Sequence, residues 1–571
     1  MLNLPRIVPE ASLPPYKLCS SNKVYNEISQ WLATAHYPCG QPVKNLHLLL
    51  LCLLLSGCNS EQPIDRPNIL WITVEDMSPH LGSWGNTLVS TPRLDHLAEQ
   101  GTRYTHLFAT APVCSAARTA LITGMYQTSI GGHQHRANQD ASSFPGLEHP
   151  KYAAVPPPDV KAFTEYLRGA GYFTSNNRKT DYNFGRPRSA WDESNNQAHW
   201  RNRESADQPF FSVFNSNLTH ESGLHEDREA VIDPSKVELP PYFPDTPVIR
   251  KDYAQMLDNV GRMDVWVGGI LDELEADGLS DNTIVFFFSD HGDGIPRAKR
   301  WLQDSGLLTP MIIRFPEGWN EPDVDSRLIS FIDLSATVLS LAGVDIPEYF
   351  EGRAFLGEQA STVEREYIFA ARDRMDEAHD RSRAVRDGQY KYIRHYHPER
   401  PFFTPNAYRD RMPLMQDLIR LNDGGELTGA AAAMFADSKP PEELFDTLDD
   451  PHEINNLATD PAYADVLLRL SEELDLWEER TGDMGAIPEE ELSEMMWPGG
   501  SQPITEMPIV RRLENEDLEL SSPTKGASIE YSTDGGVRWQ LYSTPVSGIH
   551  SDVRAIAVRY GFAQSDTMFV N

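Results

Sequence analysis

Apolar runs and amphipathic segments alternate over roughly the first 345 residues of the chain. Residues 66–76, 208–220 and 282–294 each hold an almost unbroken apolar run, which is typical of strands buried on both faces of a parallel sheet. The longest helical pattern has apolar residues at Met256, Val260, Met263, Val267, Ile270, Leu271 and Leu274. Shorter helices are predicted at 91–101, 159–169 and 331–343. This alternation predicts an α/β fold with a doubly wound sheet.

Polar residues follow three of the predicted strands at their carboxyl ends. They are Glu75–Asp76, Thr219–His220 and Asp290–His291. Ligands of doubly wound folds bind beyond the carboxyl ends of the strands, so we expect these side chains to share one site. Carboxylate oxygens favour Ca²⁺ or Mg²⁺ over zinc, whereas His291 leaves room for a transition metal.

The pattern changes after about residue 360, where strands of an antiparallel sheet and an amphipathic helix at 465–480 are predicted. We predict an α/β domain at 66–360 and an α+β subdomain at 361–496. A segment at 497–508 has the composition of a linker, and a small β-sandwich module follows at 509–571. Within that module Asp534-Gly535-Gly536 indicates a hairpin.

The composition limits the kinds of ligand that this chain can bind. The chain has 571 residues and a formal net charge of −34, which argues against a nucleic-acid-binding protein, whose surface would be basic. Hydrophobic residues make up 40% and charged residues 23%, as in ordinary globular proteins. An anionic ligand would therefore need a local basic pocket in an acidic field.

Residues 44–60 have the organisation of an export signal. A basic start is followed by a leucine-rich run too short to span a bilayer as a mature helix, and then by Leu-Ser-Gly-Cys. This ending resembles a bacterial lipobox and predicts lipidation of Cys58. We expect an exported, membrane-anchored lipoprotein in the periplasm, at the outer membrane or at the cell surface. Residues 1–42 fit no export signal, which points to an alternative start at Val43.

Cys114 begins a stretch of small residues with the pattern of a helix start. Processing at Cys58 would remove the three earlier cysteines, so Cys114 would be the one unmodified cysteine and no intramolecular disulfide could form. The positive end of a helix stabilises an anion, and Arg118 lies one turn further on. We therefore expect an anion to bind near Cys114.

The sequence CSAAR at 114–118, with Thr-Gly at 123–124, matches the signature Cys-x-Pro/Ala-x-Arg-x4-Thr-Gly. With RPNILWITVED at the front, SDHGDG late in the core and ELFDTLDDPHEINNLA near residue 450, the chain resembles type I formylglycine-dependent sulfatases over about residues 66–460. The resemblance implies a mixed sheet of the alkaline-phosphatase superfamily. It also implies that a formylglycine-generating enzyme oxidises Cys114 to formylglycine (3-oxoalanine). One hydroxyl of the hydrated aldehyde would attack sulfur and the other would then expel sulfate.

The same resemblance assigns roles by position. It implies one divalent cation, Ca²⁺ or Mg²⁺, held at the modified Cys114 by Glu75, Asp76, Asp290 and His291. The family commonly has Asp-Asp at the first pair and often Asn at the last position, so Glu75 and His291 depart from its pattern.

The remaining assignments concern the sulfate group and proton transfer. Arg118 would orient the formylglycine, and Lys179 and Lys299 would contact sulfate. His220 would protonate the leaving group, a task suited to imidazole. The base of the elimination step would be Asp181 or one of two histidines, with the histidines favoured. The two histidines are His133 and His135.

Two further segments bear on saccharide binding. The polar stretch 370–383 either contacts sugar groups at the pocket rim or forms a solvated loop. Its candidate contacts are Arg372, Arg374, Asp376 and His379. The tail from about 509 resembles the β-sandwich module at the C-terminus of some chitobiases, where Trp539 and Tyr542 either stack on sugar rings or pack in the core.

These observations predict a sulfatase that removes sulfate esters from a sulfated saccharide or polysaccharide. One alternative is cleavage of N-sulfated glucosamine, and another is hydrolysis of a phosphonate or phosphate ester on the same fold. A third alternative is an inactive homologue that only binds glycans. Substitution of Cys114 by alanine separates this last hypothesis from the others. A glycan-binding protein would still bind its ligand after the substitution, whereas an enzyme would lose turnover.

Overall fold

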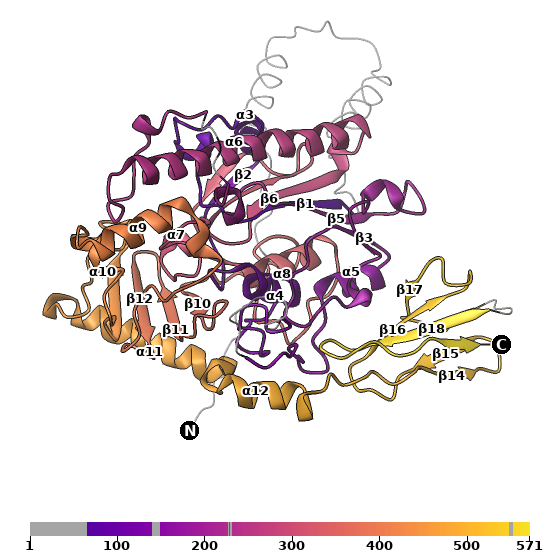
Figure 1. Cartoon of the computed structure of the whole chain (residues 1–571). Helices are drawn as coiled ribbons and strands as arrows, with labels where there is room; N and C mark the ends of the chain where they lie inside the picture. The colour runs from indigo at the N-terminus through magenta and orange to yellow at the C-terminus, as the bar shows by residue number, and fades with distance from the viewer. Residues whose placement is uncertain (1–65, 140–148, 227, 229–230, 548–551, 571) are drawn as a thin grey trace, which may run out of the picture. The chain divides into compact units, whose positions relative to one another are not determined.

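The structure is a computed structural model that describes residues 66–139, 149–226, 228, 231–547 and 552–570. These residues fall in one compact unit, 63–571 (Figure 1). The predicted signal and Cys58 lie outside the described residues. Within the described ranges, every helix is too short or too polar to cross a bilayer.

A nine-stranded mixed sheet forms the centre of the fold. Its strand order is β4 (Glu193–Ser194), β3 (Phe173–Asn177), β5 (Phe210–Ser216), β1 (Asn68–Val74), β6 (Thr283–Ser289), β7 (Leu308–Arg314), β2 (Thr102–Phe108) and β8 (Asp323–Asp325), with β9 (Ile329–Ser330) also on β2. Strand β7 runs antiparallel to both neighbours, whereas β1 is parallel to β5 and β6. The predicted α/β mixed sheet is confirmed.

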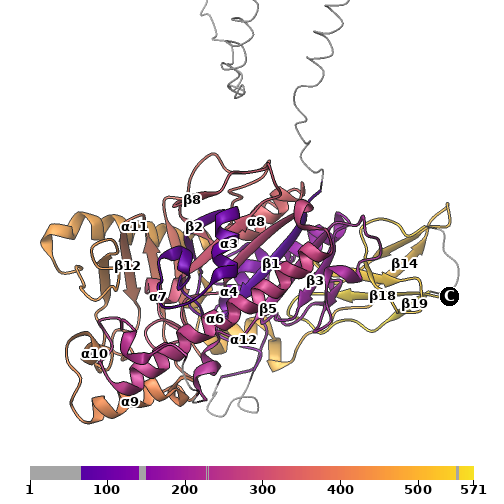
Figure 2. The same cartoon turned by 90° about the horizontal axis from the view of Figure 1, so that it is seen from above.

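Helices cover both faces of this sheet, which explains the unbroken apolar strands. Helices α3 (Pro92–Gln100) and α6 (Pro247–Ala276) lie on one face (Figures 1 and 2). Helices α4 (Cys114–Thr123), α5 (Phe163–Gly169) and α8 (Phe331–Leu341) lie on the other. Along β1, Leu70 and Ile72 pack in the hydrophobic core on the side of α3 and α6. Ile69 and Trp71 pack in the core on the side of α4, α5 and α8. Both side-chain rows of the strand are therefore buried.

An antiparallel sheet follows, as the sequence predicts. Its order is β10 (Ile368–Arg372), β11 (Ser382–Arg386), β12 (Tyr390–His395) and β13 (Glu442–Asp446). Helix α11 (Ala464–Thr481) packs on it through Leu470, Leu474 and Trp477. The other α-helices in the described part of the chain are α7 (Asp304–Leu307), α9 (Pro413–Asp423), α10 (Gly429–Ala433) and α12 (Glu489–Met496).

The terminal module contains two small sheets. One pairs β14 (Ile509–Arg512) with β15 (Leu518–Ser521). The other has the order β17 (Gln540–Leu541), β16 (Ser528–Ser532), β18 (Val553–Val558) and β19 (Met568–Val570). Pairing of Tyr531 with Gln540 confirms the hairpin. The resemblance to the chitobiase module stays a prediction.

The terminal module packs on the α/β domain through a buried polar interface. The Tyr560 hydroxyl donates to Glu165 at 2.6 Å, and the Ser528 hydroxyl donates to the other oxygen of that carboxylate at 2.5 Å. Arg168 of α5 forms a buried ion pair with Glu530 of β16 at 3.0 Å. The segment 497–508, predicted as a linker, also makes ordered contacts, because the Trp497 indole donates to the Gly561 carbonyl at 3.1 Å.

Candidate active site

The carboxyl ends of three parallel strands bring the candidate ligands together. Val74 lies opposite Ser216 of β5 and Ser289 of β6, so all three strands end at the same level. Asp76 lies two residues beyond the end of β1, and its backbone N–H donates to the Asp290 carboxylate at 3.1 Å. The sequence-based expectation that these strand ends meet is therefore correct.

Cys114 is the first residue of α4 and is fully buried. Val113, which precedes it, supplies no side-chain cap, so the helix N-terminus directs its free N–H groups and positive dipole end toward the Cys114 side chain. The Cys114 sulfur lies 3.4 Å from Nε2 of His291 and 3.9 Å from Oδ1 of Asp76. Burial alone would raise the pKa of Cys114, but Lys179 and Lys299 outweigh it and lower the pKa to about 7. An anionic group is therefore favoured at this position.

Two overlapping groups of side chains could hold a metal ion. Their members are Glu75, Asp76, Cys114 and His220 in one, and Asp76, Cys114, Asp290 and His291 in the other, each with its ligand atoms within 4.8 Å of one another. The predicted ligand set is thus divided, because Glu75 sits with His220 and away from the second group. Both groups are rich in carboxylate oxygens, which suits a hard divalent cation.

The charges of the second group support this reading. Burial would lower the pKa of His291, yet Asp290 and Asp76 raise it to about 10. The carboxylates thus draw a proton onto His291 and concentrate negative charge where a cation would bind. A ligating imidazole is neutral, so cation binding here would release that proton. The residues present fit a divalent cation.

Two lysines face the same space. Lys299 Nζ lies 2.7 Å from Asp76 and 2.9 Å from Glu221, and Lys179 Nζ lies 2.5 Å from Glu75. Burial would lower the pKa of Lys299, but the adjacent Asp76 and other negative groups hold it well above its usual value. Both lysines are therefore charged and able to bind an anionic ester.

Arg118 contributes an unsatisfied donor. Its Nε donates to Asp290 at 3.0 Å and its Nη1 donates to Asn215 at 2.9 Å. Its Nη2 is buried and has no hydrogen-bond partner among the described residues. Such a group is costly unless a ligand or water satisfies it, so Nη2 marks a place for an anion's oxygen.

His220 is oriented for proton transfer. Its Nδ1 lies 2.8 Å from the Ser222 hydroxyl, and its Nε2 lies 3.3 Å from Lys299 Nζ on the side of the metal ligands. Burial and Lys299 lower the pKa of His220, but Asp76, Cys114 and Glu75 raise it further, so the net shift is upward. The nearby acidic groups thus favour the protonated imidazole.

The three candidate bases occupy different surroundings. Asp181 forms a two-point contact with Arg136, at 3.0 Å and 3.3 Å, and its carboxylate lies 3.6 Å from Lys179. His135 Nδ1 lies 2.9 Å from the hydroxyl of Ser115, which adjoins Cys114. Burial lowers the pKa of His135 to about 3, so its ring is neutral.

His133 differs from the other two candidates, because both of its ring nitrogens are buried without a hydrogen-bond partner among the described residues. Burial lowers its pKa, and the charges that act on it are those of Asp373, Arg383, Asp483 and Glu489. Of the three, Asp181 and His135 therefore have contacts with groups beside Cys114.

Sequence reasoning missed a second layer of charges. Arg300 donates to both oxygens of Glu221 at 2.8 Å and 2.9 Å and to Asp376 at 3.0 Å. Glu221 in turn contacts Lys299, so this chain of ion pairs fixes the lysine. Glu221 and Arg300 directly follow His220 and Lys299, but nothing in the pattern indicated their pairing.

Backbone strain gathers at the same place. Positive φ values at non-glycine residues cost free energy and persist where the surroundings enforce them. Five such residues lie in or around the site: Asp76 (φ 54°), Arg136 (52°), Asp181 (52°), Arg300 (75°) and Asp376 (54°).

Most of the predicted rim is buried. Arg374 is 1% exposed and donates to Glu489 of α12 and to the carbonyls of His135 and Asp376. Arg372 is 3% exposed and pairs with Asp380. Asp376 is held by Arg300, and only His379 has a half-exposed side chain. Arg372 and Arg374 therefore fit a structural role better than contact with a sugar.

Comparisons with known proteins identify the family of the chain. A sequence model of the sulfatase family matches residues 67–344, and a model of the N-sulphoglucosamine sulphohydrolase C-terminal region matches residues 297–403. The chain is 42% identical over 551 residues to an ulvan-active sulfatase of Formosa agariphila, covering 89% of this chain and 91% of that protein.

More distant relatives extend the comparison. The chain is 26% identical over 498 residues to N-sulphoglucosamine sulphohydrolase of Homo sapiens, covering 76% of this chain and 93% of that protein. The solved structure of a 2-O GAG sulfatase shares the fold with a TM-score of 0.54 at 19% identity, covering 73% of this chain and 93% of that one. From its sequence and fold, the chain belongs to the sulfatase family and is a sulfuric ester hydrolase.

Proposed function

We propose that this sulfatase hydrolyses sulfate esters of a sulfated polysaccharide, with formylglycine made from Cys114 and one divalent cation. The observation that carries the proposal is the position of Cys114, at an uncapped helix N-terminus near the buried Lys299 and the partly buried Lys179, within 4.8 Å of a carboxylate-rich ligand set. The 42% identity to a protein named as an ulvan-active sulfatase supports a polysaccharide substrate.

The residues divide the work electrostatically. Lys179 and Lys299 bind the anionic sulfate and offset the charge that grows on the leaving oxygen. Arg118 has a buried Nη2 without a partner among the described residues, and this donor is free for an oxygen of the bound ester. When bound, the cation withdraws electron density from the sulfate oxygens, and the oxidised Cys114 supplies the nucleophilic hydroxyl.

Proton transfer is assigned to groups on either side of Cys114. His220 is the proposed proton donor to the saccharide oxygen as the S–O bond breaks, and its Nε2, which lies 3.3 Å from the Lys299 ammonium, faces the site. Asp181 or His135 accepts the proton that is lost when sulfate is expelled. His135 is neutral, with one nitrogen beside the Ser115 hydroxyl, but burial lowers its pKa to about 3 and so weakens it as a base. Arg136 and Lys179 likewise lower the pKa of Asp181, so the geometry leaves both groups as candidates.

Ca²⁺ is the proposed cation, with Mg²⁺ as the alternative. The ligand set offers several carboxylate oxygens at irregular positions, which suits the flexible coordination of Ca²⁺ better than the strict octahedron of Mg²⁺. Removal of the ion by a chelator, followed by addition of each metal in turn, identifies the one that restores sulfate release.

A second candidate reaction is cleavage of N-sulfated glucosamine. The match of residues 297–403 to the N-sulphoglucosamine sulphohydrolase C-terminal model favours it, as does the 26% identity to the enzyme of Homo sapiens. The two reactions differ in the atom that leaves sulfur, which is oxygen in an ester and nitrogen in a sulfamate.

Sulfate release from a panel of substrates tests both candidates. The protein is coexpressed with a formylglycine-generating enzyme, and the panel holds sulfated algal and glycosaminoglycan saccharides, an N-sulfated glucosamine and a phosphonate monoester. We expect sulfate from an ester substrate and none from the Cys114→Ala variant. If the mass of the peptide shows oxidised residue 114 but only the phosphonate is cleaved, the proposed reaction is wrong.

We also propose that the chain is exported and carries lipid on Cys58. The leucine-rich run and Leu-Ser-Gly-Cys support this proposal. In a bacterial host, the Cys58→Ser variant should remain unprocessed and lose its labelled acyl chain. Acylation of the variant equal to that of the native chain would contradict it.

A further inference from the structure

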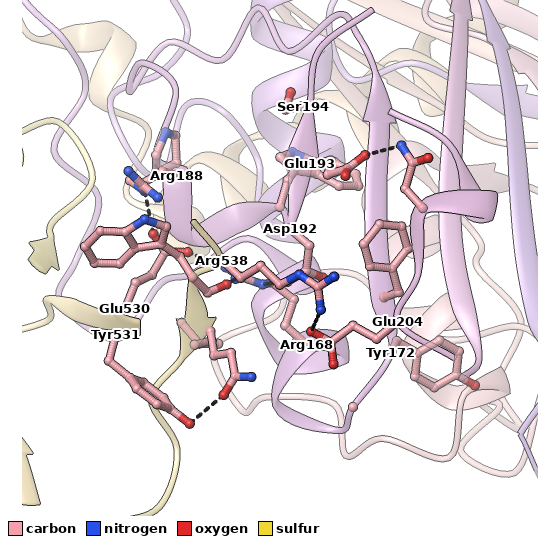
Figure 3. Close-up of a pocket in the computed structure, with 18 of the residues that line it drawn as sticks. Arg168, Tyr172, Arg188, Asp192, Glu193, Ser194, Glu204, Glu530, Tyr531 and Arg538 are labelled. Atoms are coloured by element: carbon pink, nitrogen blue, oxygen red, sulfur yellow. Dashed lines mark hydrogen bonds and ion pairs between the residues drawn. The ribbon is translucent and has the colours of Figure 1, made fainter. Parts of the chain in front are cut away.

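A groove outside the active site is lined by residues of both the terminal module and the α/β domain. It has a volume of about 710 Å³, which is within the range of ligand-binding pockets. One wall comes from segments around β3 and β4, and the other from the hairpin β16–β17 (Figure 3). Thr180 and Tyr182 also line it, whereas Lys179 and Asp181, which alternate with them, contact active-site groups. The loop 179–182 therefore has the active site on one side and the groove on the other.

Arginines gather in this groove although the chain is strongly acidic. Arg168, Arg186, Arg188 and Arg538 line it, in a protein with a net charge of −34. Figure 3 labels three of them, of which Arg168 is buried, with 2% of its side chain exposed, whereas Arg188 and Arg538 are accessible. A concentration of guanidinium groups is what an anionic ligand needs in an acidic field.

Four acidic residues line the groove as well, and their accessibility decides whether the groove can bind an anion. Glu530 is 2% exposed and is neutralised by Arg168 and Arg188. Asp192 accepts hydrogen bonds from Arg168 and from Thr174. Glu530 is therefore buried, whereas the Asp192 side chain stays 24% exposed beside Arg168. Both carboxylates hold the arginines in place.

The other acidic residues lie at the rim. Glu193 accepts a hydrogen bond from Asn202, and Glu204 pairs with Arg538 at 2.9 Å. The latter pair is exposed, with 67% of the arginine and 57% of the glutamate accessible, so water screens it and a ligand sulfate can replace the glutamate. Arg186 is exposed and forms no ion pair within the described part of the chain.

Aromatic rings complete the groove. Trp539 is half-buried, its indole N–H donates to the Gly536 carbonyl at 3.0 Å, and the guanidinium carbon of Arg188 lies 4.6 Å from the ring centroid. Tyr531 is half-buried, and its hydroxyl donates to Gln540 at 2.7 Å. Fixed aromatic faces suit the C–H faces of sugar rings, and the adjacent guanidinium groups suit their sulfates.

We propose that this groove binds a second stretch of a sulfated polysaccharide, apart from the ester being cleaved. The proposal rests on the proposed function only for the choice of polymer, and it concerns binding rather than chemistry. Because the groove holds the chain close to the active site, it raises the local concentration of sulfate esters there. The effect applies to long substrates and vanishes for saccharides too short to reach both places.

Binding of a polymer to a protein that cannot turn it over tests the groove. In the Cys114→Ala background, we compare the variant Arg186→Ala/Arg538→Ala with the control Arg511→Ala/Arg512→Ala. The control removes two exposed arginines from β14 of the same module, so it changes the net charge equally. The probes are dextran sulfate and uncharged dextran, and the active site contributes equally in both proteins.

We expect the dissociation constant for dextran sulfate to rise about 10-fold in the groove variant and less than about 2-fold in the control. Equal weakening in both variants would show that general surface charge binds the polymer, and would overturn the proposal. Equally tight binding of uncharged dextran would overturn the anionic class of ligand. Unchanged thermal unfolding of each variant excludes misfolding as the cause.

Kinetics of the oxidised enzyme separates this proposal from the proposed function. With native Cys114, the groove variant should show a higher KM on a sulfated polymer and an unchanged kcat, with both values unchanged on a short oligosaccharide. An equal rise in KM on the short oligosaccharide would contradict a second binding site. If neither substrate releases sulfate but the dextran sulfate result holds, the groove stands and the proposed reaction fails.

Discussion

Two buried arginines illustrate how a binding site differs from a structural ion-pair cluster. Arg118 is 5% exposed and Arg383 is fully buried, and both contact aspartates. Arg383 uses every donor, on Asp483 and Asp373 and on the carbonyls of Arg372 and Ser382. Arg118 leaves one terminal nitrogen buried and unpaired. Burial and charge are therefore common to both arginines, and the unpaired terminal nitrogen of Arg118 is what distinguishes it from Arg383.

The largest effect is expected from residue 114 itself. Cys114→Ala removes the nucleophile but keeps a small apolar side chain at the start of α4, so sulfate release should fall at least about 1,000-fold. The free energy of unfolding should change little. A sulfate-release assay and chemical denaturation of the same preparation check both expectations, and residual turnover within about 10-fold of native would contradict the assigned role.

Arg383→Ala should have the opposite profile. It removes the arginine that Asp373 contacts and leaves Asp483 with Arg381 as its remaining charge partner, so the free energy of unfolding should fall by about 3–5 kcal/mol. Folded molecules should retain native kcat, because Arg383 contacts none of the candidate catalytic groups in the described structure. Denaturation and activity per folded molecule are the measurements. A selective loss of kcat without loss of stability would contradict a structural role of Arg383 and would make it resemble Arg118.

Arg118→Lys sharpens the same comparison from the active-site side. Lysine keeps the charge but cannot bridge Asp290, Asn215 and a ligand oxygen with one planar group. We expect kcat/KM to fall about 100-fold, with a smaller loss of stability than in the Arg383 variant. Kinetics on a short sulfated saccharide measures the effect, and an unchanged kcat/KM would show that the unpaired Nη2 has no role in binding.

The smallest effect concerns acid stability of the structural cluster. Burial would raise the pKa of Asp483, but Arg383 beside it holds the pKa well below its usual range. A group whose pKa is depressed by folding stabilises the protein above its unfolded pKa, about 3.9 for Asp, and this stability is lost as pH falls further.

Asp483→Asn should therefore destabilise the protein at pH 7, and the difference from native should shrink as pH falls below about 4. Denaturation curves at a series of pH values measure this convergence. A difference that stays constant down to acid pH would show that packing, rather than the charge of Asp483, stabilises the cluster.

Sequence reasoning went furthest where function follows local pattern. The strand ends carrying Asp76 and Asp290, and the helix that begins at Cys114, could be predicted because apolar runs and the CSAAR motif are local signals. The antiparallel course of β7 could not, because its seven residues have the same apolar character in either direction. The buried state of Arg374 was also hidden, since its partner Glu489 lies 115 positions away.

The polar contact between Glu165 and the terminal module has a consequence for protein engineering. Gly526 and Gly561 leave no room for a side chain, since an added Cβ would lie 2.4 Å from the carbonyl oxygens of Pro158 and Ala154. The surface of the terminal module is thus complementary to the α/β domain of this chain. Transplanting residues 509–571 onto an unrelated hydrolase would transfer only one side of this interface. A functional chimera therefore has to include α5 and the segment before it as well.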